Sequence, residues 1–317
     1  MIDLFQLRHV ILIVIIGLSL AVTVVIMNRR SSNTMMSADP IEIPSLNRSK
    51  WDDEKLVVIP AIWKEIDWAN QSSWPAWLLA GFKPQSSYRV HLYQRIDPNS
   101  TAPYDWPYCP NLHEEAGVYL KFIHDYYYDL PKKMLFIHGD PFVYGPFPIA
   151  AAQCVRDDVH YTSINSEWVT GRAWNIWENA ENDTIERMYR CASYLLGLFG
   201  FDGESQLNPK NLVDKTNSTV TAPCCAQFFV TRERIQHYTY EQWSAIYRAN
   251  QRTYCVSPGD TEIPGERGTK WFASSLQHLW HIILGLHPNE ISLPKSKTAS
   301  DLCHVFRSSC NGSPCLN

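Results

Sequence analysis

Apolar runs of strand length recur along the chain. Leu56–Ile62 and Met134–Ile137 are continuous and apolar, as buried strands are. Between them, Tyr88–Gln94 alternates Tyr, Val and Leu with more polar residues, which is typical of a strand with one wetter face. A fourth run, Ala226–Thr231, is apolar except for Gln227, and a charged helix start follows it. These segments predict the strands of one sheet.

Other segments carry apolar residues at helical spacing. A helix is expected from Asn111, which suits the N-cap position and has Glu114 three residues later, as in a capping box. Leu130 and Pro131 are expected to end this helix. Further helices are predicted at Asn182–Phe199, Glu241–Asn250 and Lys270–Leu284, the last ended by Gly285 and Pro288.

The order strand, strand, helix, strand predicts an α/β fold. With 317 residues, 45% of them hydrophobic, the chain can bury one substantial core. We therefore expect one α/β domain over residues 51–290, with a central mixed sheet flanked by helices, and a cysteine-containing tail over residues 291–317.

The N-terminal region predicts a membrane anchor. Residues 10–27 carry no charge and are mostly Val, Ile and Leu, close to the ~20 residues that a membrane-spanning helix needs. The run ends at Arg29 and Arg30 without a small-residue cleavage site, which favours an uncleaved signal anchor. Residues 1–9 would form a short cytosolic tail, and the Ser-, Asn- and Pro-rich residues 28–50 a flexible stem.

Two kinds of observation bear on the orientation of this anchor. Arg8 lies before the span and two arginines after it, which favours a cytosolic C-terminal part. Several Asn-x-Ser/Thr patterns for N-glycosylation and the nine cysteines instead favour a C-terminal part in an oxidising lumen. We give these two observations more weight than the arginine count. The domain is therefore expected on the luminal side of the secretory pathway, in the Golgi or ER. The patterns begin at Asn47, Asn70, Asn99, Asn182, Asn217 and, more weakly, Asn311.

The cysteine count bears on disulfide pairing, and the net charge bears on nucleic-acid binding. Cys224 and Cys225 are adjacent and are expected to reach distant partners among Cys109, Cys154, Cys191 and Cys255. Nine is an odd number, so at least one cysteine stays free or pairs between chains. The net charge of −4 provides no basic face for nucleic acid.

Short motifs follow one another along the chain in this order: Lys64-Glu65, Asn111, Glu115, Tyr119-Leu120, Leu130-Pro131, Phe136–Gly139, Cys225–Phe228, Val230, Arg232–Ile235, Leu279–His281, Ile283 and Gly285. Together they resemble the domain-of-unknown-function 3431 family (DUF3431), over roughly residues 56–285. The resemblance implies a fold similar to the nucleotide-sugar-binding glycosyltransferases, with a sugar donor, a glycan or protein acceptor, and Mn²⁺ or Mg²⁺. Two positions depart from the family pattern: His113 stands where glycine is usual, and Asp140-Pro141-Phe142 where His or Arg is usual.

Polar residues at the strand ends are the candidates for donor binding. Asp140 follows a buried strand and a glycine, and is the candidate metal ligand; its alternative role is a turn before Pro141. Glu65 and Asp67 end the first strand, where a base or ribose would lie, or belong to a solvated loop. His138 is a further substrate-binding candidate.

The strand that ends at Thr231 supplies a second group. Arg232 could bind a phosphate at a helix start, whereas Glu233, a catalytic candidate, is also explained by the helix dipole. Gln227 must be hydrogen-bonded to protein or to ligand if it is buried. His278 is a substrate-binding candidate one helical turn from His281.

Glu115 and His281 are the candidates for the base that takes the acceptor's proton. Glu114 is assigned mainly a capping role. Trp168, Trp174 and Trp177 could stack on an acceptor sugar, although such residues more often pack on the protein body.

Two other functions remain open. One is a non-enzymatic luminal receptor or scaffold, favoured by the missing Asp-x-Asp pair and the change at His113. The other is a metal-dependent hydrolase that uses His113, Glu115, His138 and Asp140. A transferase predicts that Glu65, Glu115, Asp140, Arg232 and His281 converge on one pocket.

Overall fold

The structure is a computed structural model of the chain. It describes residues 51–143, 145, 147–165, 168–169, 191–202, 222–223, 226–251, 272–273, 275–285 and 302–311. All of these residues belong to one compact unit, residues 46–317.

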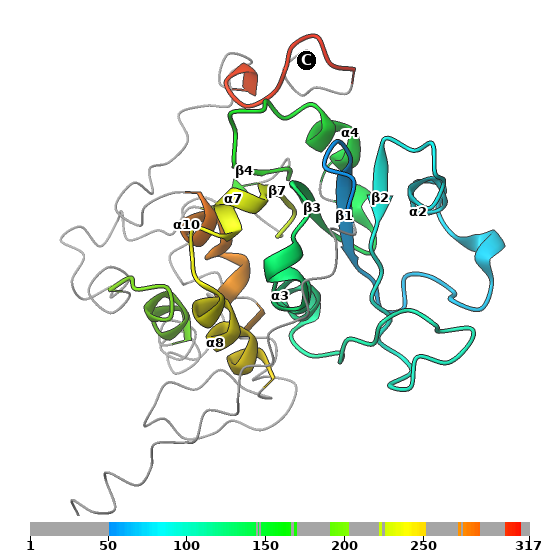
Figure 1. Ribbon diagram of the computed structural model, residues 1–317, viewed down its shortest axis with the longest axis horizontal. Coiled ribbons are helices and arrows are strands. Elements are labelled where there is room, and N and C mark those ends of the chain that lie inside the picture. Colours follow the sequence, from blue (N-terminus) through cyan, green and yellow to red (C-terminus); the bar gives the residue numbers. More distant parts are fainter. Residues whose placement is uncertain are drawn as a thin grey trace, which may run out of the picture. The chain divides into compact units, whose positions relative to one another are not determined.

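A five-stranded mixed sheet forms the centre of this unit (Figure 1). Strands β2, β1 and β3 are parallel, whereas β7 is antiparallel to both of its neighbours, β3 and β4. Helices pack against the sheet, so the predicted α/β fold with a mixed sheet is confirmed. In spatial order the strands are β2 (Tyr88–Val90), β1 (Leu56–Ala61), β3 (Lys133–His138), β7 (Phe228–Thr231) and β4 (Tyr161–Ser163). Strands β5 (Trp168–Val169) and β6 (Ala222–Pro223) form a separate antiparallel pair.

The second predicted strand is shorter than expected. Strand β2 ends at Val90, and the chain then bends so that Gln94 pairs with the loop at Tyr108 instead of with β1. The side chain of Gln94 accepts hydrogen bonds from the backbone N–H groups of Ile96 and Asp97. A polar side chain that bonds its own backbone competes with the strand ladder, which explains the early end.

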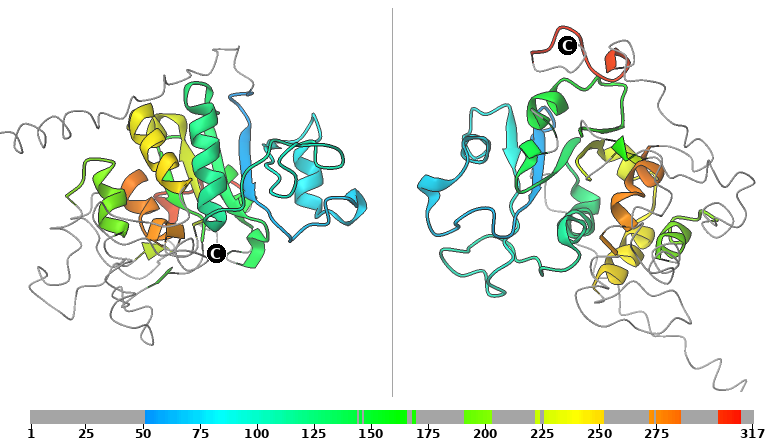
Figure 2. Two further views of the ribbon diagram at one scale, coloured as in Figure 1. Left: turned by 90° about the horizontal axis from the view of Figure 1, so that it is seen from below. Right: turned by 180° about the vertical axis from the view of Figure 1, so that it is seen from behind.

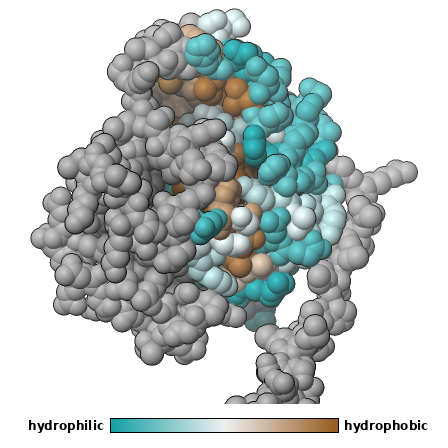
Figure 3. All heavy atoms as spheres, turned by 90° about the vertical axis from the view of Figure 1, so that its left-hand side faces the viewer, coloured by the Kyte–Doolittle hydropathy of each residue, from teal (hydrophilic) through white to brown (hydrophobic). Residues whose placement is uncertain are grey.

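One face of the sheet is covered by α3 (Glu114–Tyr126), α8 (Tyr240–Asn250) and α10 (Trp280–Leu284) (Figure 2). The predicted apolar stripe of α3 faces Val57, Ile59 and Phe136 of the strands. Helix α8 begins with the capping box that Thr239 and Gln242 form. On the α8–α10 side of the molecule, apolar atoms gather beside hydrophilic ones (Figure 3).

The other face carries α4 (Pro148–Gln153), with α2 (Ala76–Gly81) beside the edge strand β2. Phe306, from the C-terminal segment, packs into the same cluster as Val58 and Ile137. Helix α2 was not predicted from the sequence, because its six residues are too few to show a helical period. Short 3₁₀ turns lie at Gln71–Ser73, Tyr127–Asp129 and Pro141–Val143.

The start of α3 differs from the prediction. The helix begins at Glu114, its N-cap is His113 in a left-handed conformation (φ 53°), and His113 makes no side-chain cap bond. Asn111 is therefore not the N-cap, and its predicted capping box with Glu114 is wrong. The backbone before the helix is instead held by Arg95, whose Nη2 donates to the carbonyl oxygens of Pro110 and Leu112.

The structure describes two other predicted helices only in part. Residues 191–197 are helical, in agreement with the end of the predicted helix Asn182–Phe199. The predicted helix Lys270–Leu284 is interrupted by a turn at His278 and Leu279, after which α10 begins at Trp280. Gly285 is the C-cap of α10, as expected.

Cys154 is bonded to Cys310, with an S–S distance of 2.01 Å. Cys154 and the buried free thiol Cys109 are therefore excluded as partners of Cys224 and Cys225, and of the four predicted partners Cys191 and Cys255 remain. Cys191 and Cys303 are disulfide-bonded as well. The free Cys109 agrees with the odd number of cysteines.

Some predictions lie outside the described residues. They include the membrane anchor (residues 10–27), the stem, Trp174, Trp177, Cys224, Cys225 and three of the glycosylation patterns. Among the described residues, no helix has the length and apolar character that crossing a bilayer requires.

Candidate functional site

The carboxyl ends of β1 and β3 lie side by side. Ala61, the last residue of β1, pairs with His138, the last residue of β3. Beyond these ends, a β-carbon at Gly139 would lie only 2.9 Å from Cδ of Glu65. Glycine at position 139 therefore lets the Glu65 side chain lie against the loop after β3.

At this end of β1 and β3, the connections that leave the neighbouring strands run in opposite directions across the sheet. From β1 the chain passes to β2 on one side, and from β2 it crosses back to β3 on the other side of β1. Helix α2 follows β1 and α3 follows β2. In open α/β sheets, ligands bind beyond the carboxyl ends of strands at such a topological switch point.

Glu65, Asp67 and Asp140 are exposed near this switch point. The Oε2 atom of Glu65 accepts hydrogen bonds from the backbone N–H groups of Trp63 (2.6 Å) and Lys64 (2.9 Å), which hold the carboxylate in place. Asp67 Oδ1 accepts from Ala69 N and shapes its own turn. Asp140, directly after Gly139, brings a second exposed carboxylate to the ends of the strands.

Gln227 is fully buried and fastens the loop after β3 to β7. Its Oε1 accepts from His138 N, and its Nε2 donates to the oxygens of Pro141 and Asn165 Oδ1, each at 3.2 Å. The amide group is thus hydrogen-bonded to protein on both its nitrogen and its oxygen. Gln227 positions the loop that carries Asp140, which is the first of the two roles its sequence allowed.

Arg95 and Glu115 are two buried ionisable residues near the start of α3 that influence each other electrostatically. Each is only 6% exposed. The pKa of Glu115 is raised to about 7, mainly by burial and to a smaller extent by the charge of Glu114, while a backbone hydrogen bond and the Arg95 guanidinium oppose the rise. Burial lowers the pKa of Arg95, and the charges of Glu115 and Glu65 are among those that oppose this shift. Arg95 therefore links Glu65 and Glu115 electrostatically.

Arg95 was missed from the sequence. The signal that pointed to Glu65 was a charged residue just after an apolar strand. The same signal applied to Arg95, which directly follows the expected strand Tyr88–Gln94. Within the described part of the chain, Arg95 Nε has no hydrogen-bond partner although it is buried. Such a donor is a candidate contact for an anion.

His113 lies between this pair and the helix layer. It is 1% exposed, and its ring lies 4.4 Å from that of Phe272, centroid to centroid. Its left-handed φ is one that glycine adopts without strain, which gives a physical reason for the glycine usual at this position in the family pattern. Glu114 has a positive φ as well (51°). Strained backbone of this kind clusters at functional sites.

Arg232 and Glu233 lie at the other end of the strands from Glu65 and Asp140. Because β7 is antiparallel to β3, Thr231 pairs with Lys133 at the amino end of β3. Arg232 donates from Nε to Leu130 O (2.6 Å) and from Nη2 to Asp53 Oδ1 (2.7 Å). The prediction that Arg232 converges with Glu65 and Asp140 is therefore wrong, since it assumed a β7 parallel to its neighbours.

His278 and His281 lie in the helix layer. His281 is 3% exposed, and burial, followed by the charge of His278, lowers its pKa to about 4. The neighbouring Trp280 stacks near Tyr119 and Phe228 in the core. His281 is thus neutral at physiological pH and packs in the hydrophobic layer.

Among the described residues, no three His, Cys, Asp or Glu side chains are grouped so that they could hold a metal ion. This grouping was the basis of the hydrolase hypothesis, and His113 is buried against Phe272 instead. Asp140 by itself offers one exposed carboxylate.

The structure thus defines an α/β protein with carboxylates and a buried arginine around one switch point of a mixed sheet. The chain belongs to the family described as protein of unknown function (DUF3431), whose model matches residues 57–300. The resemblance to this family is therefore confirmed. No curated protein matches the chain, and no solved structure does.

Proposed function

We propose that the protein is a membrane-anchored luminal glycosyltransferase that moves a sugar from a nucleotide-sugar donor to a glycan or protein acceptor. The observation that carries the proposal is the contact of Glu65 with Gly139 at the switch point, with Asp140 beside it. Glycine at position 139 leaves room for the Glu65 side chain beside the strand ends, next to Asp140. Asp67 and His138 flank the same strand ends and would contact the base or ribose.

In such a transfer, an acceptor hydroxyl oxygen attacks the anomeric carbon. The bond from this carbon to the phosphate oxygen breaks, and the nucleoside diphosphate leaves. Glu115 would take the hydroxyl proton, because a pKa of about 7 suits a general base at neutral pH. The guanidinium of Arg95 would stabilise the negative charge of the leaving diphosphate.

A divalent cation is part of the proposal. Mg²⁺ is commonly bound by one or two carboxylates together with substrate phosphates. Asp140 would supply such a carboxylate, and the bound Mg²⁺ or Mn²⁺ would neutralise charge on the diphosphate.

The direct test uses the full chain in detergent, incubated with a panel of nucleotide sugars with and without Mn²⁺. We expect binding and hydrolysis or transfer of one donor, and a drop of at least about tenfold in Asp140→Asn, since charge stabilisation at a leaving group is worth this much or more. Glu233→Gln is the matched control, because Glu233 is an exposed acid at the other end of the strands. Failure to bind or turn over any donor would contradict the proposal.

The luminal placement has its own test. Asn70, Asn99 and Asn311 are exposed, so each acceptor asparagine is accessible to glycosylation. We expect a glycosidase to shift the full chain on a gel. A band that does not shift, from a secretory-pathway host, would contradict this topology.

A non-enzymatic receptor or scaffold is the second candidate. One reason is that Glu65 Oε2 accepts its two hydrogen bonds from backbone N–H groups of the protein itself. A second is that, among the described residues, Asp140 belongs to no group of side chains that could hold a metal ion. Binding of a donor without turnover under any metal condition would favour this candidate.

A further inference from the structure

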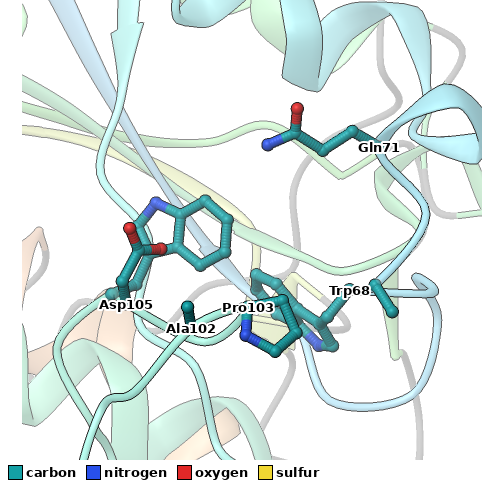
Figure 4. Close-up of a pocket in the computed structure, with 7 residues that line it drawn as sticks. Trp68, Gln71, Ala102, Pro103 and Asp105 are labelled. Atoms are coloured by element: carbon teal, nitrogen blue, oxygen red, sulfur yellow. The ribbon is translucent and has the colours of Figure 1, made fainter.

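A pocket of about 500 Å³ opens beside the loop that follows β1 (Figure 4). This volume lies within the range of small-molecule sites. Figure 4 shows Gln71 on one side of the pocket and Asp105 on the other, with Pro103 and Trp68 next to each other in the lower part of the view. Its lining consists of Trp68, Ala69, Gln71, Ala102, Pro103, Asp105 and Trp106.

One wall of the pocket is a rigid aromatic cluster. Trp106 lies 5.4 Å from Trp68 and 5.3 Å from Trp74, between ring centroids. The indole nitrogen of Trp68 donates to Trp63 O, and that of Trp74 donates to Asp67 O. Hydrogen bonds therefore fix the rings of Trp68 and Trp74, and Trp106 packs against both of them.

The loop before Ala102 and Pro103 is also held by hydrogen bonds. Gln94 is fully buried and binds the backbone of Asp97 as both donor and acceptor. Asp97 in turn accepts from the backbone N–H groups of Asn99 and Thr101 and from the Thr101 hydroxyl. These bonds fix the loop that leads into Ala102 and Pro103.

We propose that this pocket binds a pyranose ring. A sugar ring presents apolar C–H faces and a rim of hydroxyl groups. The indole of Trp106, which is half-buried, suits the C–H face, whereas the exposed Asp105 carboxylate and Gln71 amide suit the hydroxyl rim. An anionic ligand would be repelled by Asp105, and a purely apolar ligand would leave both polar groups without bonds.

The pocket adjoins the proposed donor site. Glu65 lies at the beginning of the loop after β1, and Trp68 lines the pocket three residues later. A ring bound here would be the acceptor sugar; this assignment, unlike saccharide binding itself, rests on the proposed function.

The ring could come from two sources, which share the same chemistry. One is an acceptor glycan. The other is the protein's own glycan, because Asn70 lies between the lining residues Ala69 and Gln71, and Asn99 lies three residues before Ala102.

The test titrates the full chain, in a detergent without sugar, with methyl glycosides of glucose, galactose, mannose and N-acetylglucosamine. The background is Asn70→Gln with Asn99→Gln, which removes both nearby glycans. Saturation-transfer NMR reports binding. We expect at least one glycoside to bind, and Trp106→Ala to weaken its binding by at least about tenfold.

Trp106 also packs on other tryptophans, so a second variant guards against misfolding. Asp105→Ala with Gln71→Ala changes only exposed side chains and should weaken binding to a similar extent. Trp63→Ala is the control, because Trp63 is 40% exposed on the same loop but does not line the pocket.

The inference is overturned if no glycoside binds, or if Asp105→Ala with Gln71→Ala binds as tightly as the background. In the chain with both asparagines intact, direct binding supports the acceptor role. Binding that appears only after deglycosylation supports an intramolecular glycan and overturns the acceptor role. Donor turnover depends on Asp140 and not on Trp106, so failure of the donor assay alone leaves saccharide binding standing.

Discussion

Glu65 lies against Gly139, so close that a β-carbon at position 139 would come within 2.9 Å of Glu65 Cδ. The contact joins the loops after two neighbouring parallel strands. It places a carboxylate held by two backbone N–H groups next to Asp140. The most direct predictions concern this contact.

Gly139→Ala should displace the Glu65 side chain. The clash is with a side chain that is exposed and can move, so we expect the free energy of unfolding to change by less than about 1 kcal/mol. Donor binding, by contrast, should weaken by about tenfold or more, since a misplaced group at a site costs this much. Isothermal titration with the donor and urea unfolding measure the two effects.

Gly197→Ala is the control for that prediction, because a β-carbon there would meet no atom within 4 Å. Equal donor affinity in Gly139→Ala and the wild type would show that the position of Glu65 does not matter for binding.

Gln227→Leu should destabilise the fold. The change leaves the backbone N–H of His138 and the oxygens of Pro141 and Asn165 without their buried amide partner. We expect a loss of about 3 kcal/mol in the free energy of unfolding, measured by urea denaturation. Gln251→Ala, at an exposed position, should have no comparable effect. A loss below about 1 kcal/mol would mean that the Gln227 hydrogen bonds do not hold the loop after β3 to β7.

Removal of the Cys154–Cys310 disulfide should cost about 2–5 kcal/mol of stability, because the bond closes a long loop with a sequence separation of 156. The double variant Cys154→Ala with Cys310→Ala, followed by thermal unfolding, measures this loss. Limited proteolysis should also cut the segment around Phe306 sooner. Cys109→Ala, which removes a buried free thiol, should leave the protease pattern unchanged; early cleavage in that variant too would contradict the assignment.

Glu115 should make the protein less stable as the pH rises. Its pKa is about 7 in the folded state and near 4.5 when unfolded, so between these values the folded state holds a proton that the unfolded state has lost. The free energy of unfolding should therefore fall by about 3 kcal/mol from pH 4.5 to above pH 7. Glu115→Gln should remove this component, as urea titrations at pH 5 and 8 can show. An unchanged pH profile in the variant would mean that Glu115 is not a buried acid.

His281 should act in the opposite direction. Its pKa is about 4 in the folded state against 6.5 when unfolded, so the unfolded state takes up a proton first as the pH falls. The stability contribution is complete above pH 6.5 and should decline by about 3 kcal/mol toward pH 4. His281→Phe should keep more of its stability at pH 4.5 relative to pH 7.5 than the wild type does. His237→Gln, at an exposed position, is the control and should follow the wild type; a His281→Phe profile that also follows it would contradict the prediction.

Much of the fold was readable from local pattern. Strand β1, strand β3 and helix α8 lie where the hydrophobic period placed them, because each buries one continuous apolar run or stripe. Glu65 and Asp140 were selected as candidates because the carboxyl ends of parallel strands meet at one end of the sheet, and the structure places both after such strand ends. Arg95 was missed because Gln94 ends strand pairing through local side-chain bonds that no periodicity reveals.

The sequence by itself determined the α/β class, most helices and the residues that follow β1 and β3, since these depend on contacts within short segments. Only the tertiary structure decided that β7 runs antiparallel to β3, because the direction of a strand depends on connections through distant parts of the chain. This one reversal sends Arg232 to Asp53 at the other end of the strands and leaves Arg95 as the buried cation near Glu65 and Glu115. The same long-range folding brought Trp68 and Trp106 together into a pocket that neither segment could form alone.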